Sequence, residues 1–211
     1  MSYQTLLDAV IKGDIKTAKE ETLKVVDAGQ NAQDILDQGL IEAMNVVGDN
    51  FSKGAIFVPQ MLRSAKTMQE CVEVLKPDFQ ENAMITKGNI VLGTVKGDLH
   101  DIGKNLVRMM VEGAGFTTID LGVDVALDVF VNKIKEANAD VVGMSALLST
   151  TMPSMSLTIK ALADSGLRDT VKVIIGGAPV TRKYAEDIGA DAYASDAGSA
   201  VLEAKKILNI T

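Results

Sequence analysis

The chain has 211 residues, enough for one large domain or two small ones, and 47% of them are hydrophobic, which is ample material for a buried core. Its formal net charge of −7 argues against nucleic acid as a partner, because binding to phosphates requires clustered Lys and Arg. A single cysteine, Cys71, excludes an internal disulfide framework. The sequence shows no secretory signal at its start and no apolar run of the ~20 residues that a membrane span needs. We therefore expect a cytoplasmic protein with no membrane partner.

Residues 1–78 carry hydrophobic side chains at helical spacing throughout. The pattern predicts a first helix that ends at Gly13, a second from Ile15 to Gly29 and a third from about Ala32 to Val47. A fourth begins at Pro59, because a proline in the first turn loses no helical hydrogen bond. Four amphipathic helices with short connections predict a small antiparallel four-helix bundle.

The segment Gly48–Pro59, between the third and fourth helices, is too apolar for an exposed loop. Phe51 and Val58, together with Met61 at the start of the next helix, can point in one direction. Two interpretations stay open from the pattern alone. These side chains either close the end of the bundle or form an apolar lid over a neighbouring ligand.

A polar linker, residues 79–88, precedes a domain of alternating strands and helices at residues 89–211. Apolar runs predict strands at Asn89–Val95, Thr117–Asp120, Asp140–Ser145, Val171–Gly176 and Asp191–Ala194, and helices at Lys104–Gly113, Leu127–Ala137, Pro153–Ser165, Thr181–Ile188 and Gly198–Leu208. This alternation predicts a flavodoxin-like (Rossmann-type) parallel sheet of five strands in the order 2-1-3-4-5, with helices on both faces. The whole chain is then an α bundle followed by an α/β domain.

In that strand order, the loops after strands one and three flank the position where such sheets bind ligands. The first of these loops, Gly97–Gly103, carries His100, the only histidine of the chain, two residues after Asp98. Asp98 is close enough to hydrogen-bond the imidazole nitrogen that faces away from a ligand, although an isolated pair of this kind is often a solvated turn. With one His and one Cys, the chain cannot form a Cys/His zinc site. A metal held by His100 must therefore bring its other ligands, as in a macrocycle.

Other ligands of such sheets leave different motifs. Neither G-x-G-x-x-G nor a P-loop occurs, and a phospho-acceptor domain would place an aspartate where this chain has Ser145. The pair Gly176–Gly177 follows the fourth strand. It allows either the close approach of a flat group or a tight turn.

Three motifs together, Asp98-x-His100-x-x-Gly103, Ser145-x-Leu147 and Gly176–Gly177, resemble the fingerprint of cobalamin-binding proteins of the base-off/His-on type. Here 41 residues separate Gly103 from Ser145, and 28 separate Leu147 from Gly176. The chain is most similar to the small corrinoid proteins of methyltransferase systems for methanol, methylamines or betaines, and to the cobalamin-binding module of methionine synthase. The resemblance covers nearly the whole chain, because Asn45–Lys66 is similar to the cap bundle of these proteins.

The resemblance implies that a cobalamin or related corrinoid binds with its own base displaced and with His100 as the lower axial ligand of cobalt. Asp98 and Ser145 would complete a proton relay with His100. The residues implied in cofactor binding are Gly97, Asp98, Leu99, His100, Asp101, Ile102, Gly103, Ser145, Leu147, Ser149, Thr150, Gly176 and Gly177, with Phe51, Val58 and Met61 sheltering the upper face.

The implied function is that of a carrier, not catalytic alone, which accepts a methyl group on cobalt(I) from a substrate-specific methyltransferase subunit. It would deliver the group from methyl-cobalt(III) to a second methyltransferase with a thiol or tetrahydrofolate-type acceptor, and a reductive activase would serve it. His100 would release and rebind cobalt in each cycle, and the connector at residues 78–88 would be the hinge. The alternatives are the cobalamin domain of a mutase, a regulatory cobalamin protein, or a nucleotide- or flavin-binding flavodoxin-like module.

Overall fold

The structure, a computed structural model, describes residues 3–75, 77 and 86–210. The chain divides into two compact units: one is Met1–Thr86 with Glu112–Gly115, and the other is Lys87–Val111 with Phe116–Thr211. Most of the predicted linker, residues 79–85, lies outside the described residues. In the part of the chain that the structure describes, no helix is long and apolar enough to cross a membrane.

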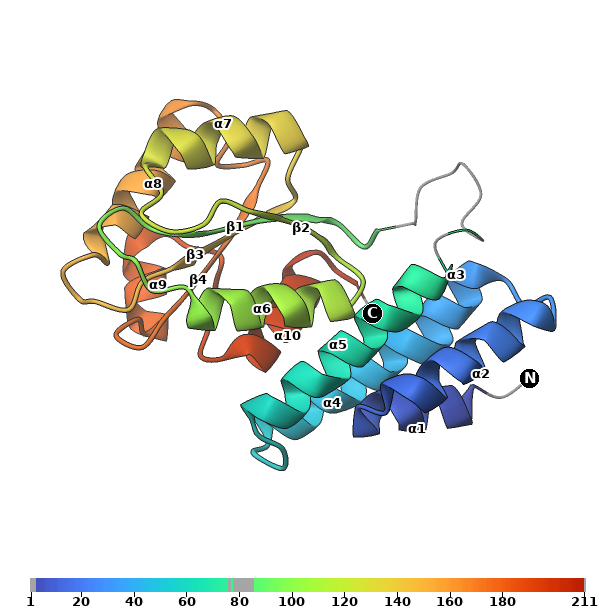
Figure 1. The fold of residues 1–211 in the computed structure, drawn as a ribbon. Helices are drawn as coiled ribbons and strands as arrows, with labels where there is room; N and C mark the ends of the chain where they lie inside the picture. Colours follow the sequence, from blue (N-terminus) through green and yellow to red (C-terminus); the bar gives the residue numbers. More distant parts are fainter. Residues whose placement is uncertain (1–2, 76, 78–85, 211) are drawn as a thin grey trace. The chain divides into compact units, whose positions relative to one another are not determined.

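The first unit is helical, as predicted (Figure 1). Its elements are α1 Gln4–Lys12, α2 Ile15–Asp27, α3 Ala32–Asp34, the π-helix η1 Ile35–Ile41, α4 Glu42–Ser52 and α5 Val58–Leu75. The predicted third helix is thus one helical run from Ala32 to Ser52 with a π-helical segment inside it. The prediction that this helix ends at Val47 is wrong, because the following residues continue α4 and Phe51 belongs to its last turn.

Local signals set the ends of these helices. The φ angle of +69° at Gly13 ends α1 in the left-handed conformation that glycine tolerates. The side chain of Asp14 accepts a hydrogen bond from the Thr17 N–H and caps α2, and Asn31 caps α3 in the same way. The apolar faces then meet in a core whose fully buried members include Leu6, Val10, Ile35, Leu40, Met44, Met61 and Leu75.

The second unit is a parallel sheet in the order β2-β1-β3-β4-β5, which confirms the predicted fold class and topology. Its strands are β1 Asn89–Thr94, β2 Thr117–Asp120, β3 Val141–Ser145, β4 Lys172–Gly176 and β5 Ala192–Ala194, each end within one residue of its predicted position. Its helices are α6 Ile102–Gly113, α7 Leu127–Ala137, α8 Pro153–Asp164, α9 Arg182–Ile188 and α10 Ala197–Ile207. Figure 1 shows α7 and α8 on one side of this sheet, and α6 and α10 on the other.

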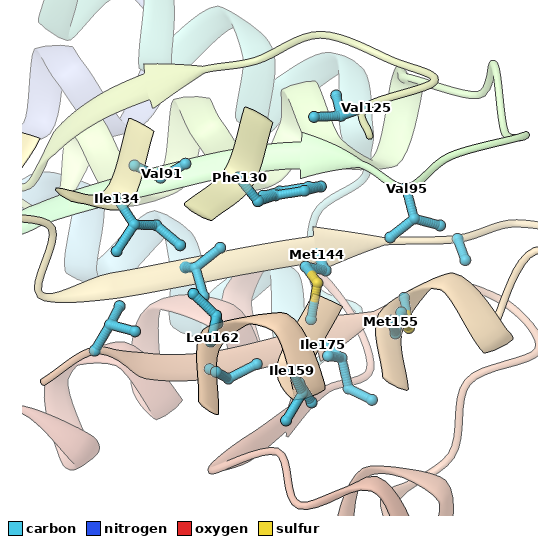
Figure 2. Packing of buried hydrophobic residues seen from close by; sticks show 14 of the residues in the cluster. Val91, Val95, Val125, Phe130, Ile134, Met144, Met155, Ile159, Leu162 and Ile175 are labelled. Carbon is cyan, nitrogen blue, oxygen red and sulfur yellow. The ribbon is translucent and has the colours of Figure 1, made fainter. Parts of the chain in front are cut away.

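The main core of this unit lies on the α7 and α8 side (Figure 2). Alternate strand residues such as Val142 and Met144 point into it, where they pack with Phe130 of α7 and Leu162 of α8. Burying a side chain of this size contributes ~1.5–3 kcal/mol. Because Ser145 alternates with Met144, its side chain faces the opposite side of the sheet.

Candidate functional site

The candidate site lies at the carboxyl edge of the sheet, where β1 and β3 run side by side. The register pairs Thr94 with Ser145, Ser145 with Gly176 and Gly176 with Ala194, so four strands end in one row. Since β2 lies on the far side of β1, the chain direction across the sheet reverses between β1 and β3. This is the position where doubly wound sheets bind ligands.

A tight turn leads from β1 into the site. The Asp98 N–H donates to the Val95 carbonyl at 3.1 Å, and Gly97 has a φ angle of +86°. A hydrogen bond across four residues with a positive φ at the third is the pattern of a type II turn, which favours glycine there. The turn directs the side chain of Asp98 inward, and this residue has no exposed surface.

The carboxylate of Asp98 is the centre of the site's hydrogen bonding. Its Oδ1 accepts a hydrogen bond from the His100 N–H at 3.1 Å and lies 2.7 Å from His100 Nδ1. Its Oδ2 accepts hydrogen bonds from Leu147 N at 2.7 Å, Leu148 N at 3.2 Å and Thr151 Oγ1 at 2.8 Å. One buried side chain therefore joins the loop after β1 to the loop after β3.

These contacts determine the state of both side chains. Burial by itself would raise the pKa of Asp98, but the hydrogen bonds from His100, the Leu147 N–H and Thr151 outweigh it and hold the pKa well below its ordinary value. An ionised carboxylate only accepts hydrogen bonds, so the neutral imidazole carries its proton on Nδ1. Among the residues that the structure describes, no hydrogen bond reaches Nε2 of His100, so this nitrogen can accept one, on a side chain that is 51% exposed.

The hydroxyl group that donates a hydrogen bond to Asp98 belongs to Thr151, a residue that the sequence analysis did not identify. Among the residues that the structure describes, no hydrogen bond joins Asp98 to Ser145, whose main-chain carbonyl accepts from Val95 N at 3.0 Å. Thr151 is buried, whereas the two predicted hydroxyl residues before it, Ser149 and Thr150, are exposed. Because Ser149, Thr150 and Thr151 are consecutive residues with hydroxyl groups, the sequence alone does not show that Thr151 is the buried one.

Large apolar side chains are exposed in the two loops that Asp98 joins and at the start of α6. Leu99 is 72% exposed and Ile102 77%, while Leu147 and Leu148 are 43% and 44% exposed. Leu148 was not among the predicted residues. Apolar side chains gathered in this way at one edge of a sheet are characteristic of a surface that contacts a ligand.

The packing of the fold leaves no room for a side chain at Gly176 or Gly177, but it leaves room at Gly103. A Cβ atom at Gly177 would lie 1.8 Å from the Ala146 carbonyl oxygen, and one at Gly176 would lie 2.9 Å from that of Ala194. The packing of neighbouring chain segments therefore requires both glycines. A Cβ atom at Gly103 would meet nothing within 4 Å, so the fold leaves open space there.

The predicted apolar residues of the first unit have different environments. Phe51 and Val58 are half-buried, and Met61 is fully buried. Phe57, which was not among the predicted residues, is 71% exposed.

Of the predicted loop residues around His100, Gly97 and Asp101 are exposed, and Asp101 accepts a hydrogen bond from Asn105 at 3.1 Å.

Two family models match the chain. A model described as the B12 binding domain matches residues 88–204, and a second with the same description matches residues 3–76. The chain belongs to the B12-binding family. The dimethylamine corrinoid protein 1 of Methanosarcina acetivorans is 43% identical over 212 residues, covering 99% of this chain and 100% of the relative. The trimethylamine corrinoid protein 2 of Methanosarcina mazei is 38% identical, covering 96% and 94%.

Solved structures agree with this membership of the B12-binding family. A cobalamin-binding protein from Desulfitobacterium hafniense superposes with a TM-score of 0.83 at 34% identity, covering 97% of this chain and 98% of the other. The methanol:cobalamin methyltransferase complex MtaBC from Methanosarcina barkeri gives a TM-score of 0.88 at 27% identity, covering 99% and 80%.

The residues of the site fit a corrinoid. A metal held in a macrocycle can take a further nitrogen ligand, and His100 offers Nε2 for this, with its ring oriented by Asp98 as the ring of a metal-binding histidine usually is by a carboxylate. The exposed Leu99 and Ile102 suit the apolar parts of a large ring. A side chain at Gly103 would enter this open space, so a glycine there keeps room at the start of α6, three residues after His100.

Proposed function

We propose that the protein is a corrinoid carrier that moves a methyl group between methyltransferases. The observation that carries the proposal is the pair Asp98 and His100, in which a fully buried carboxylate holds an exposed imidazole with Nε2 free. The relatives named as dimethylamine and trimethylamine corrinoid proteins support it, since they match over nearly their full lengths. When bound, the corrinoid supplies the cobalt that accepts and releases the methyl group.

In this proposal a corrinoid would bind with its own base displaced, and His100 Nε2 would hold its cobalt. Asp98 keeps the proton of the ring on Nδ1 and so keeps Nε2 available. Thr151 takes the place in the relay that the sequence suggested for Ser145. Its single hydroxyl hydrogen has two acceptors at 2.8 Å, Asp98 Oδ2 and the Leu148 carbonyl, so it can change partner when the charge on Asp98 changes.

The displaced tail of the corrinoid would lie along the row of strand ends. Ser145 and Gly176 are neighbours in that row, on the side of the sheet opposite the main core. Leu147, Ser149 and Thr150 are exposed in the loop that follows, where they can contact the ring or the tail. Phe51, Val58 and Met61 remain our candidates for shelter of the upper, methyl-bearing face.

The partners follow from the chemistry of a carrier. A substrate-specific methyltransferase subunit would load the methyl group, and a second methyltransferase would pass it to a thiol or a tetrahydrofolate-type acceptor. A reductive activase would reduce the cobalt to cobalt(I) again after inadvertent oxidation. The structural neighbour that is part of a methanol:cobalamin methyltransferase complex supports the first of these partners.

The first test is the ultraviolet–visible spectrum of the protein reconstituted with hydroxocobalamin, for wild type, His100→Ala and the exposed control Lys160→Ala. We expect wild type and Lys160→Ala to retain one corrinoid per chain after desalting, with the same spectrum. The spectrum of His100→Ala should change, because the axial nitrogen is lost. A folded wild-type protein that retains no corrinoid would refute the proposal, and identical spectra for all three proteins would refute the role of His100.

A further inference from the structure

The loop between β2 and α7, residues 121–126, lies along the turn that carries the candidate histidine. Leu121 N donates to the Leu92 carbonyl at 2.8 Å, Thr94 N donates to the Gly122 carbonyl at 3.0 Å, and Val125 N donates to the Thr94 carbonyl at 3.0 Å. A parallel bridge also joins Val95 to Val125. The loop therefore continues the pairing of β2 with β1 beyond the ends of both strands.

Asp124 of this loop contacts three consecutive residues of the turn. Its Oδ1 accepts a hydrogen bond from Gly97 N at 2.8 Å, its Oδ2 lies 3.0 Å from Lys96 Nζ, and its own N–H donates to the Asp98 carbonyl at 2.9 Å. The residue adopts a φ angle of +54° to do so, a conformation that Asp and Asn tolerate better than other side chains.

The contacts of Asp124 fix the backbone on both sides of the inward-pointing carboxylate. On the N-terminal side of Asp98, the Gly97 N–H donates to the Asp124 side chain. On the C-terminal side, the Asp98 carbonyl accepts a hydrogen bond from the Asp124 N–H. Asp98 in turn holds Nδ1 of His100 at 2.7 Å. A displacement of the turn would therefore strain the contact of the carboxylate with the imidazole, because Oδ2 of Asp98 is also held by the loop after β3.

We propose that Asp124 is a positioning residue for His100, acting through the turn and Asp98. This inference rests on the proposed role of His100 as a ligand of cobalt. The Asp124 side chain is 42% exposed and lies outside the hydrophobic core, so its loss should disturb the turn much more than the fold.

Three substitutions separate the parts of this contact. Asp124→Gly keeps the left-handed backbone and removes the carboxylate. Asp124→Asn keeps an oxygen for Gly97 N and tolerates the same φ, but loses the ion pair. Lys96→Met removes only that ion pair, whose partners are 61% and 42% exposed. The matched control is Asn138→Gly, because Asn138 is also left-handed, with a φ angle of +44°, and lies at the far end of α7.

The first readout needs no cofactor. The chain has one histidine, so ¹⁵N NMR of protein without a histidine tag gives the signals of a single imidazole. Spectra are compared under conditions in which the ring is neutral, and there we expect wild type, Asn138→Gly, Asp124→Asn and Lys96→Met to show the ring proton fixed on Nδ1. In Asp124→Gly the two ring nitrogens should shift towards each other, because the ring exchanges between tautomers.

The second readout is the affinity for hydroxocobalamin. We expect about 3- to 10-fold weaker binding by Asp124→Gly, which is the usual net contribution of one hydrogen bond, and recovery in Asp124→Asn. Equal tautomer signals and equal affinities in Asp124→Gly and Asn138→Gly would overturn the inference. If His100→Ala proves spectrally identical to wild type, the proposed ligand role fails, and the NMR comparison still decides whether Asp124 positions the ring.

Discussion

Asp98 Oδ1 lies 2.7 Å from His100 Nδ1, and the two residues differ sharply in environment: Asp98 has no exposed surface, whereas the His100 side chain is 51% exposed. The imidazole is thus anchored at one nitrogen in the protein interior and presents the other outward. Because Oδ2 of the same carboxylate binds the loop after β3, the position of the ring depends on two loops at once. The predictions below test what this anchoring contributes.

Asp98→Asn should lower the free energy of unfolding by ~2–4 kcal/mol, because it leaves buried donors without acceptors. Both carboxylate oxygens face N–H or O–H donors, and an amide has only one oxygen. Whichever way the amide turns, its NH₂ group meets a donor. Urea unfolding of the cofactor-free protein measures the loss.

The control for this substitution is Asp164→Asn, which removes an exposed ion pair with Lys160. It should change the free energy of unfolding by less than ~0.5 kcal/mol. Equal effects of the two substitutions would mean that the network around Asp98 does not contribute to stability.

The stability of wild type should fall in acid partly because of Asp98. Its pKa in the folded state is below the ordinary value of about 3.9, so its contribution is complete above that value and is lost as the pH falls further. Asp120 also makes the protein less stable in acid, because its pKa in the folded state is lowered. Burial would raise this pKa, but Lys104, the Gly122 N–H and Arg108 together lower it. The urea midpoints of wild type and Asp98→Asn should therefore differ by a constant amount from pH 7 to about pH 4 and approach each other as the pH falls towards 3. Parallel curves would contradict this assignment.

Thr151 and Ser145 can be distinguished by removing each hydroxyl. Thr151→Val should lower the free energy of unfolding by ~1–2 kcal/mol, since it deletes a buried donor to an ionised carboxylate at 2.8 Å. Ser145→Ala should cost less than ~0.5 kcal/mol, because the Ser145 main-chain hydrogen bond is kept. If Ser145→Ala lowers the free energy of unfolding more than Thr151→Val does, the relay hydroxyl would be that of Ser145.

The contacts within short segments could be predicted from the sequence, and those between distant segments could not. The pairing of Asp98 with His100 follows from a spacing of two residues on a loop. Thr151 and Asp124 lie 53 and 26 positions from Asp98 in the chain, and only the strand order and the two loop conformations bring them to it.

Helix bounds show the same limit. The sequence pattern located every strand and every helix of the α/β unit, because β1, β3 and β4 are mostly apolar and alternate with amphipathic helices. In the first unit, Gly48 suggested a helix end, yet α4 continues to Ser52. The π-helix at Ile35–Ile41 changes which side chains share a face, and a fixed helical period cannot predict it.

Lys104 is a buried lysine that forms a partly buried ion pair with Asp120, which the sequence pattern did not reveal. Its Nζ lies 2.6 Å from Asp120 Oδ1, and only 3% of the side chain is exposed. Lys104→Met should lower the free energy of unfolding by ~1–2 kcal/mol, because Asp120, whose side chain is 21% exposed, loses its closest cation and keeps only Arg108 at 3.4 Å. Lys160→Met, at a position that is 70% exposed, is the control and should change stability by less than ~0.5 kcal/mol. Similar losses in both variants would show that burial of Lys104 has no energetic consequence.

Gly177 and Gly103 should respond in opposite ways to alanine. Gly177→Ala places a Cβ atom 1.8 Å from the Ala146 carbonyl oxygen at a φ angle of +129°, so we expect it to lower the free energy of unfolding by more than ~3 kcal/mol. Gly103→Ala meets no atom within 4 Å and lies in the first turn of α6, where alanine should keep or raise stability by up to ~1 kcal/mol.

The same Gly103→Ala variant should bind hydroxocobalamin at least about tenfold more weakly, since a methyl group would occupy the space beside His100 that we assign to the corrinoid. Urea unfolding without the cofactor and binding titration with it separate the two effects. A variant that is as stable as wild type and binds as tightly would show that the space at Gly103 is not used by the ligand. A variant that is stable but binds weakly would mark Gly103 as a glycine that the ligand requires and the fold does not.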